Sequence, residues 1–243
     1  MKDLEIRWLG TADFEEALII QRETADTVKK SGRGILLACE HPTVITLGKR
    51  GQPLTDLLAS MDSLRQRKIK IVASDRGGQA TLHNPGQLVL YPIIDLRKWG
   101  MGVKTYVECL ERATALYLAE YGVEVFRGYE PGLYSNDQKI AAFGIRIDRG
   151  VTLHGLAINM NNDLEPFSLI KQCGQLSRPT NLQEEMAKFG YERTHWDFPA
   201  EVEKWKQLFI NEATLNSLLT IPSLSESEPQ SELQPEPTAT LEI

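Results

Sequence analysis

The sequence has little of what a secreted, membrane-spanning or nucleic-acid-binding protein needs. It carries 27 lysines and arginines against 33 aspartates and glutamates, a net charge of −6, whereas binders of nucleic acids or anionic membranes usually show a basic excess. No apolar run approaches the roughly 20 residues of a membrane span. Residues 1–5 contain no apolar segment typical of a signal peptide. We therefore expect a cytoplasmic protein that binds neither membrane nor nucleic acid.

Cysteine is also scarce, because the chain has only Cys39, Cys109 and Cys173. The odd number, the wide spacing and the lack of a C-x-x-C pair indicate a reducing compartment, and they argue against a disulfide framework or a zinc site. Cys109 falls on the apolar face of an expected helix and is predicted to be inert core. Cys173 lies in a polar, glycine-containing segment, where a thiol is reachable and is a better candidate nucleophile.

Apolar periodicity predicts helices and strands mixed along one chain. We expect Thr11 to cap the first helix and Ser31-Gly32 to end it. The expected strands are 4–8, 34–39, 44–48, 69–73, 88–94, 123–126, 138–147 and 151–160, and the expected helices are 11–29, 55–66, 103–121, 181–189 and 199–213. This mixture predicts the α/β or α+β class with a large mixed sheet.

The composition changes near the end of the chain. Residues 222–243 are acidic, rich in proline and serine, and free of aromatic residues. Such a segment cannot bury enough apolar surface to offset the entropy lost on ordering. We expect a single folded domain over residues 1–221 and a disordered tail over residues 222–243.

The stretch from Arg76 to Gln87 contains three glycines and a proline between two expected strands. Glycine permits positive φ and close backbone approach, so the stretch must turn sharply. One interpretation is a tight hairpin between core strands, since Gly-Pro clusters mark turns more often than sites. Arg76 and His83 favour a site instead, because a turn needs neither and both are costly to bury.

Two further stretches combine strand patterns with polar residues. In Gly132–Ile147 an apolar strand begins at Lys139. A lysine at a strand start is usually solvated, but the small residues Ala142 and Gly144 leave room beside the strand for a ligand. The stretch His154–Asp163 begins as a strand and ends in polar residues that suit a loop at the strand end.

These residue types are suited to acyl transfer. A cysteine thiol, with a pKa of about 8.5, is mostly protonated at neutral pH, and a nearby cation lowers that pKa. Lys139 or His83 can supply the cation or the base, and Cys173 can then attack a thioester and form an acyl-enzyme. Backbone N–H groups at Gly77-Gly78 or at the turn that follows Cys173 can stabilise the oxyanion.

From about residue 34 to 185 the chain resembles the lipoyl(octanoyl) transferases, which are octanoyl-acyl-carrier-protein:protein N-octanoyltransferases. Several separate motifs occur in the order found in that family, and the spacing from Lys139 to Cys173 is similar to the family's. The motifs are Glu40-His41-Pro42, Arg76 to Gln87, Gly132-Leu133-Tyr134, Lys139 to Arg146, His154 to Asn159, and Cys173-Gly174.

The resemblance implies the fold of biotin and lipoate protein ligases, with a large mixed sheet, a smaller sheet and flanking helices, in one catalytic domain over residues 1–221. It implies that Cys173 carries an octanoyl thioester and that Lys139 lowers the pKa of its thiol and shuttles protons. The implied substrate-binding residues are Arg76, Gly77, Gly78, Gln79, Ala80, Thr81, Leu82, His83, Ala142, Phe143, Gly144, Gly155, Leu156 and Ala157.

The resemblance also implies the partners of the reaction. The donor is octanoyl-acyl carrier protein, and the acceptors are the apo-lipoyl domains of 2-oxoacid dehydrogenase E2 subunits and the glycine cleavage H protein. The reaction is the first step of endogenous protein lipoylation, carried out by a monomer without metal, other cofactor or ATP. The absence of ATP agrees with the lack of a G-x-x-x-x-G-K phosphate loop.

Three positions depart from the family pattern. Leu82 replaces a tyrosine and lacks a phenol that could hydrogen-bond in the site. Asn84 replaces a glycine, and asparagine tolerates positive φ better than most residues. Gln172 replaces a proline directly before the expected nucleophile. None of these changes removes the thiol or the amine that the mechanism uses.

Two other functions stay open on the sequence alone. One is an ATP-dependent ligase of the same fold, which would use Lys139 but needs no cysteine at position 173; the Gly-Arg-Gly-Arg type loop of biotin ligases is absent, since the chain reads Arg76-Gly77-Gly78-Gln79. The other is a non-catalytic module that binds a carrier protein.

His41 has either a structural or a catalytic role, and His195 has no assigned chemistry. Trp205 and Phe209 are expected to pack on the domain.

Overall fold

The computed structural model describes residues 2–128, 130–171, 178–193 and 195–219. Its strands are β1 (Leu4–Thr11), β2 (Gly34–Glu40), β3 (Val44–Leu47), β4 (Lys70–Ala73), β5 (Ala80–His83), β6 (Gln87–Ile93), β7 (Phe126–Arg127), β8 (Leu133–Ser135), β9 (Gln138–Asp148) and β10 (Val151–Asn159). Its helices are α1 (Phe14–Ser31), α2 (Pro53–Asp56), α3 (Met61–Gln66), α4 (Val103–Ala119), α5 (Leu182–Ala187), α6 (Phe198–Leu219) and the short 3₁₀ helix η1 (Glu165–Leu169).

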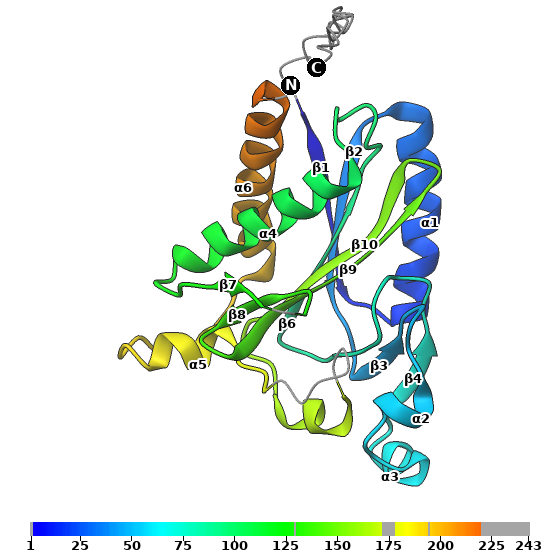
Figure 1. Ribbon diagram of the computed structural model, residues 1–243, viewed down its shortest axis with the longest axis vertical. Coiled ribbons are helices and arrows are strands. Elements are labelled where there is room, and N and C mark those ends of the chain that lie inside the picture. The colour runs from blue at the N-terminus through cyan, green and yellow to red at the C-terminus, as the bar shows by residue number, and fades with distance from the viewer. Residues whose placement is uncertain (1, 129, 172–177, 194, 220–243) are drawn as a thin grey trace, which may run out of the picture.

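Seven strands form one mixed sheet in the order β1-β2-β6-β10-β9-β8-β7, and three form a small sheet in the order β4-β3-β5 (Figure 1). In the large sheet β1 and β2 are parallel, and all other neighbours are antiparallel. The predicted class, a large mixed sheet with a smaller sheet and flanking helices, is confirmed.

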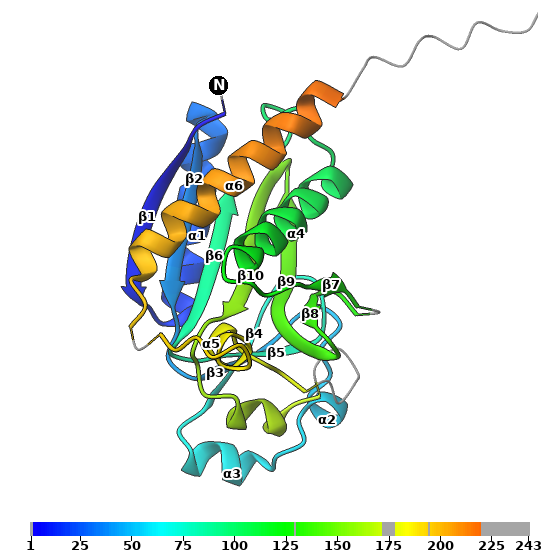
Figure 2. The ribbon, with the colours of Figure 1, turned by 90° about the vertical axis from the view of Figure 1, so that its left-hand side faces the viewer.

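Helices cover both faces of the large sheet, with α4 and α6 on one face and α1 on the other (Figure 2). The central strands β2, β6 and β10 are therefore buried on both faces, which explains the apolar runs of β2 and β6. On β2, for example, Leu36 packs in the cluster with α4 and α6, while Leu37 packs in the cluster with α1. Trp205, Phe209 and Cys109 are fully buried in the first cluster, as predicted.

The first helix begins and ends at side chains suited to these positions. The predicted cap at Thr11 is wrong, because β1 continues to Thr11 and pairs it with Glu40. The cap is Asp13, whose carboxylate accepts a hydrogen bond from the Glu15 N–H at 3.0 Å. Gly32 ends the helix with φ 77 and its N–H on the Val28 carbonyl, which confirms the predicted stop.

The glycine-rich stretch is not a plain turn between two strands. It contains β5, which pairs antiparallel with β3 in the small sheet, and the hairpin interpretation is therefore wrong. One turn lies before β5, where Gly78 has φ 87, and a second lies after β5, where Gly86 also has φ 87. A strand of four residues beside several glycines shows too little alternation to be recognised from sequence.

The last helix, expected over 199–213, is longer and runs over Phe198–Leu219. Short elements account for the remaining main differences. The expected helix 55–66 is two helices, because Leu57 is extended and Ser60 starts α3 by accepting a hydrogen bond from the Ser63 N–H. The expected strand 123–126 is reduced to β7, and β8 was not predicted.

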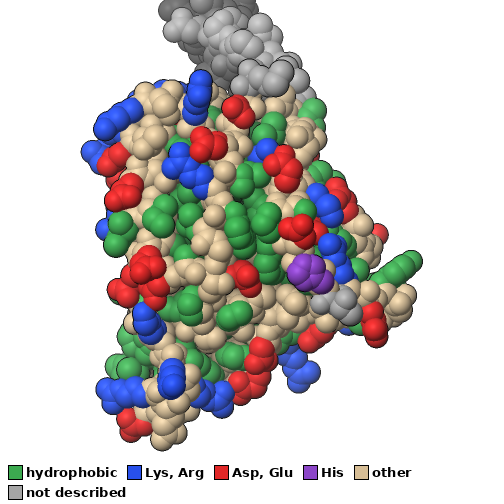
Figure 3. Space-filling view, turned by 180° about the vertical axis from the view of Figure 1, so that it is seen from behind, with side chains coloured by type: hydrophobic (Ala, Val, Ile, Leu, Met, Phe, Trp, Pro, Cys, Tyr) green, Lys and Arg blue, Asp and Glu red, His purple; other side chains and the backbone are tan. Residues whose placement is uncertain are grey.

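The surface carries mixed charge. On the face in Figure 3, Lys and Arg side chains lie among Asp and Glu side chains, around hydrophobic side chains near the centre. Within the described residues, no helix is both long and apolar enough to cross a membrane.

Candidate active site

A cavity of about 300 Å³ lies at the outer edge of β9. Strand β8 pairs with β9 only as far as Ala141, so among the described residues no strand lies on that side of the remainder of β9. The loop before β5 covers part of this edge, where the Gly77 N–H donates to the Ile145 carbonyl at 3.0 Å. Because that N–H is engaged, Gly77 cannot supply the oxyanion donor considered from the sequence, whereas the Gly78 N–H has no hydrogen bond to the described residues.

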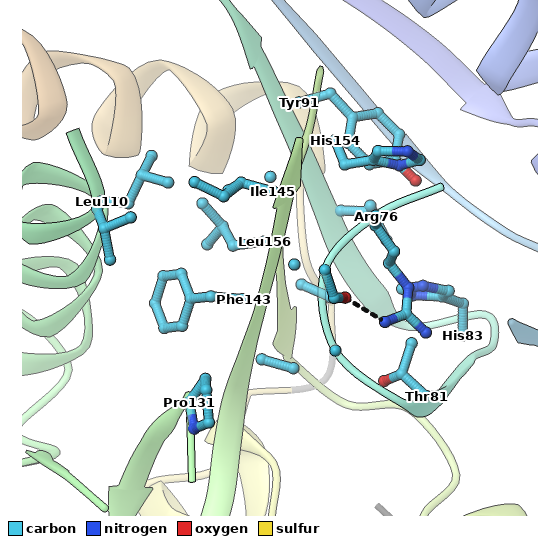
Figure 4. Close-up of a pocket in the computed structure, with 18 of the residues that line it drawn as sticks. Arg76, Thr81, His83, Tyr91, Leu110, Pro131, Phe143, Ile145, His154 and Leu156 are labelled. Atoms are coloured by element: carbon cyan, nitrogen blue, oxygen red, sulfur yellow. Dashed lines mark hydrogen bonds between the residues drawn. The ribbon is translucent and has the colours of Figure 1, made fainter. Parts of the chain in front are cut away.

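The cavity has an apolar side and a polar side, separated by β9 (Figure 4). Apolar side chains of Leu110, Phe143, Ile145 and Leu156 lie toward α4. The polar side is lined by side chains from four separate segments: Arg76, Thr81, His83, Tyr91 and His154. Such a site suits a ligand with a hydrocarbon part and a polar reacting group.

Glycines allow the close approach of backbone around the cavity. Gly144 and Gly155 are paired across β9 and β10. A Cβ at Gly155 would lie 2.2 Å from the Leu90 carbonyl oxygen, and a Cβ at Gly144 would lie 3.1 Å from the Arg76 Cδ. Side chains at these two positions would therefore displace β6 and the Arg76 side chain.

Arg76 is buried as part of the loop that precedes β5. Its guanidinium donates to the Thr46 carbonyl at 2.7 Å, to the Gln79 carbonyl at 2.8 Å and to the Gly77 carbonyl at 2.9 Å. It also donates to the Thr46 hydroxyl at 2.8 Å. These bonds explain how the arginine is buried without an unsatisfied charge, and they hold the loop in shape.

Lys139 is also buried, with 3% of its surface exposed, so the interpretation as a solvated lysine is wrong. Its Nζ lies 5.3 Å from the centre of the Tyr134 ring, and its side chain lines the cavity. The backbone of Lys139 pairs with residues 178–180. Its N–H donates to the Arg178 carbonyl and its carbonyl accepts from the Thr180 N–H, both at 3.0 Å. The strand end is thereby fixed at the cavity wall.

The expected nucleophile Cys173 lies outside the described residues, as do Gln172 and Gly174. The last described residue before this segment is Lys171, whose N–H donates to the Asp56 carbonyl at 2.7 Å. The first described residue after it is Arg178, whose carbonyl accepts from Lys139. The role of Cys173 stays a prediction.

The structure brings most of the expected binding residues to one cavity. The residues that line it are Lys139, Arg76, Gly77, Gly78, Ala80, Thr81, His83, Ala142, Phe143, Gly144, Gly155, Leu156 and Ala157. Gln79 and Leu82 do not line it. Leu82 is fully buried in the apolar cluster of the small sheet with Ile45, because alternation along β5 turns it away from Thr81 and His83.

The departure at Asn84 has a local explanation. Its side chain donates to the Asp163 carbonyl at 2.6 Å and accepts from the Asn162 amide at 3.0 Å. The positive φ in this turn, 87°, belongs to Gly86 and not to Asn84. The asparagine therefore ties two loops together rather than supplying an unusual backbone conformation.

Three histidines, His41, His83 and His154, contact the aromatic residues Phe14 and Tyr91 beside the cavity. Phe14 stacks on His83 and His154, with ring centres 5.9 and 6.4 Å apart. His41 donates from Nδ1 to the Ala12 carbonyl at 2.6 Å, so its Nε2 accepts from the Tyr91 hydroxyl at 2.8 Å. Burial lowers the pKa of His41. These contacts give His41 a structural role.

His154 has an unusual backbone for a strand residue, with φ 56. Its N–H donates to the Gln21 side chain at 2.7 Å, and its Nε2 lies 2.7 Å from Asp75. Burial lowers the pKa of His154, although Asp75 opposes this. Asp75 was not among the predicted site residues. The one feature of the sequence that could have indicated it is its position directly before Arg76. His195 is exposed and lines no part of this cavity.

The fold is that of lipoate and biotin protein ligases. A solved structure of lipoate-protein ligase A bound with ATP is similar with a TM-score of 0.62 at 14% identity, and covers 87% of this chain and 95% of that chain. The biotin protein ligase from Aquifex aeolicus in complex with biotin and ATP is similar with a TM-score of 0.55 at 13% identity, over 88% and 72%. At such identities the similarity shows the fold alone.

Sequence comparison is more specific. The family model described as the lipoyl protein ligase A/B catalytic domain matches residues 13–212. An octanoyltransferase from Alkalilimnicola ehrlichii is 40% identical over 175 residues, 72% of this chain and 78% of the relative. Another from Solibacter usitatus is 43% identical over 181 residues, 74% and 81% of the two chains. The chain therefore belongs to the lipoyl protein ligase A/B family and, within it, to the octanoyltransferases, as its motifs predicted.

Proposed function

We propose that this protein transfers an octanoyl group from octanoyl-acyl carrier protein to the lysine of an apo-lipoyl domain, through a thioester on Cys173. The observation that carries the proposal is the 38% to 43% identity to relatives named octanoyltransferase. The buried Lys139 in a cavity with an apolar side supports it, because this is a suitable place for an acyl thioester.

The first half-reaction loads the enzyme. The Lys139 ammonium favours the thiolate of Cys173 and so lowers the pKa of that thiol. The thiolate attacks the acyl carbon, a new C–S bond forms and the C–S bond to the carrier breaks. The leaving carrier thiolate takes a proton from Lys139. In the second half-reaction the acceptor amine attacks the same carbon, the amide forms and Cys173 leaves. One proton of the amine passes by way of the now neutral Lys139 to the leaving sulfur, and this restores the starting enzyme. Since a thioester is converted to an amide, no ATP is required.

The apolar side of the cavity is the proposed place of the hydrocarbon chain. Leu110, Phe143 and Leu156 line it and belong to or pack against the apolar core. Each methylene that moves from water to such a surface contributes about 0.8 kcal/mol. Arg76, Gly77, Gly78, Ala80, Thr81 and His83 would hold the polar end of the substrate, while Gln79 and Leu82 would act only through the loop and the small sheet.

The proposed acceptors are the apo-lipoyl domains of 2-oxoacid dehydrogenase E2 subunits and the glycine cleavage H protein. The reaction would be the first step of protein lipoylation, performed by a cytoplasmic monomer. The test incubates the protein with octanoyl-acyl carrier protein and an apo-lipoyl domain in the absence of ATP. Octanoylation of the acceptor lysine is expected, and its absence with fresh substrates would refute the proposal.

A second function is favoured by one observation, the similarity of the fold to ligases bound with ATP. An ATP-dependent ligase would attach free lipoate and release pyrophosphate. The same acceptor is therefore incubated with lipoate and ATP. Modification in this mixture, with none from octanoyl-acyl carrier protein, would assign the protein to the ligases.

A further inference from the structure

A chain of side-chain hydrogen bonds runs from the cavity to the backbone behind it. The His83 Nδ1 lies 2.6 Å from the Gln87 Oε1. The Gln87 Nε2 donates to the Asn159 Oδ1 at 2.9 Å, and the Asn159 Nδ2 donates to the Thr180 carbonyl at 2.9 Å. Gln87 and Asn159 face each other across β6 and β10. Both are buried, with 3% and 5% of their surfaces exposed.

The carbonyl at the end of this chain fixes the direction of every bond in it. A backbone carbonyl only accepts, so Asn159 must turn its NH₂ to Thr180 and its oxygen to Gln87. Gln87 must then turn its NH₂ to Asn159, and it has a second carbonyl acceptor at Leu82, 3.4 Å away. The Gln87 oxygen is left for His83. The Nδ1 atom of His83 therefore carries the proton, and Nε2 is the unprotonated nitrogen.

The surroundings keep this imidazole neutral. Burial lowers the pKa of His83 to about 3, and the neighbouring His41, Arg76 and His154 also lower it, against the opposing hydrogen bond to Gln87. Phe14, stacked on the ring, adds no charge. Within the described part of the chain, Nε2 has no hydrogen-bond partner. His83 thus offers the cavity a hydrogen-bond acceptor throughout the physiological pH range.

Only part of the chemistry can use an acceptor at this place. The hydrocarbon chain and the thioester carbonyl of the acyl group have no N–H or O–H to donate, whereas the attacking amine has two. We propose that Nε2 of His83 accepts an N–H of the acceptor lysine's neutral amine and aims the nitrogen lone pair at the acyl carbon, and that Gln87 is the positioning residue that holds His83 in this tautomer. This inference rests on the proposed acyl transfer.

The step is balanced without proton transfer to His83. The amine lone pair forms the C–N bond, and the C–S bond to Cys173 breaks with its electrons on sulfur. One N–H proton of the amine ends on that sulfur and restores the thiol. The other stays on the amide nitrogen. His83 contributes orientation, which is worth large factors in rate when the nucleophile is otherwise free to rotate.

A matched pair of variants tests the role of Nε2. The amide of an asparagine at position 83 falls near Nδ1 and leaves Nε2 empty, while the longer glutamine can place its oxygen near Nε2. Isolated octanoyl-enzyme is mixed with apo-lipoyl domain in a single turnover. We expect His83→Asn to slow transfer about 100-fold and His83→Gln to stay within about tenfold of wild type. Transfer by His83→Asn at the wild-type rate would overturn the inference.

Because the experiment begins with isolated octanoyl-enzyme, it separates this inference from the proposed function on which it rests. If wild-type protein forms no octanoyl-enzyme, the proposed function fails before His83 is tested. If octanoyl-enzyme forms in wild type and in His83→Asn, and the two transfer the group equally fast, only the proposed role of His83 fails. Thermal unfolding of each variant identifies effects that come from a damaged fold.

The variant Gln87→Glu tests the tautomer through the pH dependence of the transfer rate, which a purely structural role of Gln87 would not change. A carboxylate beside Nδ1 raises the pKa of His83, so Nε2 becomes protonated as the pH falls and no longer accepts. We expect the acid limb of the transfer rate to move to higher pH than in wild type. A pH profile that coincides with wild type would contradict the tautomer argument. If this variant does not fold, imidazole ¹⁵N shifts of the wild type decide, with an unprotonated Nε2 expected and a protonated one contradicting it.

Discussion

At the scale of the residue, the loop at the cavity depends on Arg76. The side chain is buried and supplies donors to carbonyls of Thr46, Gly77 and Gln79. Removing it would leave these acceptors without donors in a site that water reaches poorly, and such groups cost about 1–3 kcal/mol each.

We therefore predict that Arg76→Ala lowers the free energy of unfolding by about 3 kcal/mol. Urea denaturation measures the change. Arg65→Ala is the control, because Arg65 forms an exposed ion pair with Asp62 one helical turn away, and such pairs contribute less than about 1 kcal/mol. Equal effects of the two substitutions would contradict the account of the loop.

The buried histidines make the stability depend on pH. Burial lowers the pKa of His41, His83 and His154 in the folded protein, whereas an unfolded histidine titrates near about 6.5. Above that pH both states are neutral. Below it the unfolded chain binds more protons, and the folded state loses up to about 1.4 kcal/mol per pH unit for each histidine.

We expect the free energy of unfolding to be level above about pH 6.5 and to fall between pH 6.5 and 5, before most carboxylates titrate. Denaturation at a series of pH values measures the slope. A level profile down to pH 5 would show that these histidines are not held neutral.

The sequence indicated which residues belong to the site better than it indicated where their side chains lie in the folded protein. Lys139, Arg76 and His83 were singled out because charged or polar groups stand among glycines and apolar strands. Their burial could not be inferred, since the partners of Arg76 lie on β3 and in its own loop. Leu82 was misplaced because β5 was not recognised, and the side of a strand that a residue faces depends on knowing the strand.

At the scale of the element, the packing of β10 against β6 depends on a residue without a side chain. Gly155 lies where a Cβ would be 2.2 Å from the Leu90 carbonyl oxygen. Both strands belong to the centre of the sheet, so neither can move without disturbing both helical layers.

We predict that Gly155→Ala lowers the free energy of unfolding by about 2 kcal/mol and impairs transfer. Gly102→Ser is the control, because a Cβ at this residue has nothing within 4 Å and it caps α4, where serine is favoured. The control should change stability by less than about 0.5 kcal/mol. Near-wild-type stability of Gly155→Ala would mean that the sheet accommodates a methyl group there.

Long strands were predicted well, and short strands only in part: β3 and β4 were expected, as 44–48 and 69–73, whereas β5 and β8 were not. The strands β2, β9 and β10 were expected almost at their observed bounds, since each has at least seven residues of clear pattern. The strands β5, β7 and β8 have four, two and three residues. Of these, β5 depends on β3, a partner far along the chain, whereas β7 and β8 pair with the next strands in sequence and are too short for periodicity to mark them.

At the scale of the whole molecule, the class of fold followed from the mixture of elements, but the strand order did not. The order places β10 between β6 and β9, and this long-range pairing brings His154 beside Asp75 and Asn159 beside Gln87. Those contacts assemble the polar side of the site. They could not be derived from residues that are more than seventy positions apart.

The predicted division of the chain at residue 221 gives a further expectation. The family match ends at residue 212, and the composition beyond residue 221 is unsuited to a core. Deletion of residues 222–243 should leave the midpoint of thermal unfolding and the rate of transfer within error of the full chain. Loss of either would place part of the domain in that segment.

The central claim is that Cys173 carries the acyl group, and intact-protein mass spectrometry tests it most directly. Wild type, Cys173→Ser and the control Cys109→Ser, which alters a buried core thiol, are each mixed with octanoyl-acyl carrier protein. We predict a hydroxylamine-labile octanoyl adduct on wild type and on Cys109→Ser, and none on Cys173→Ser. A protein that transfers octanoate but shows no adduct, or the same labile adduct on Cys173→Ser, would contradict the account.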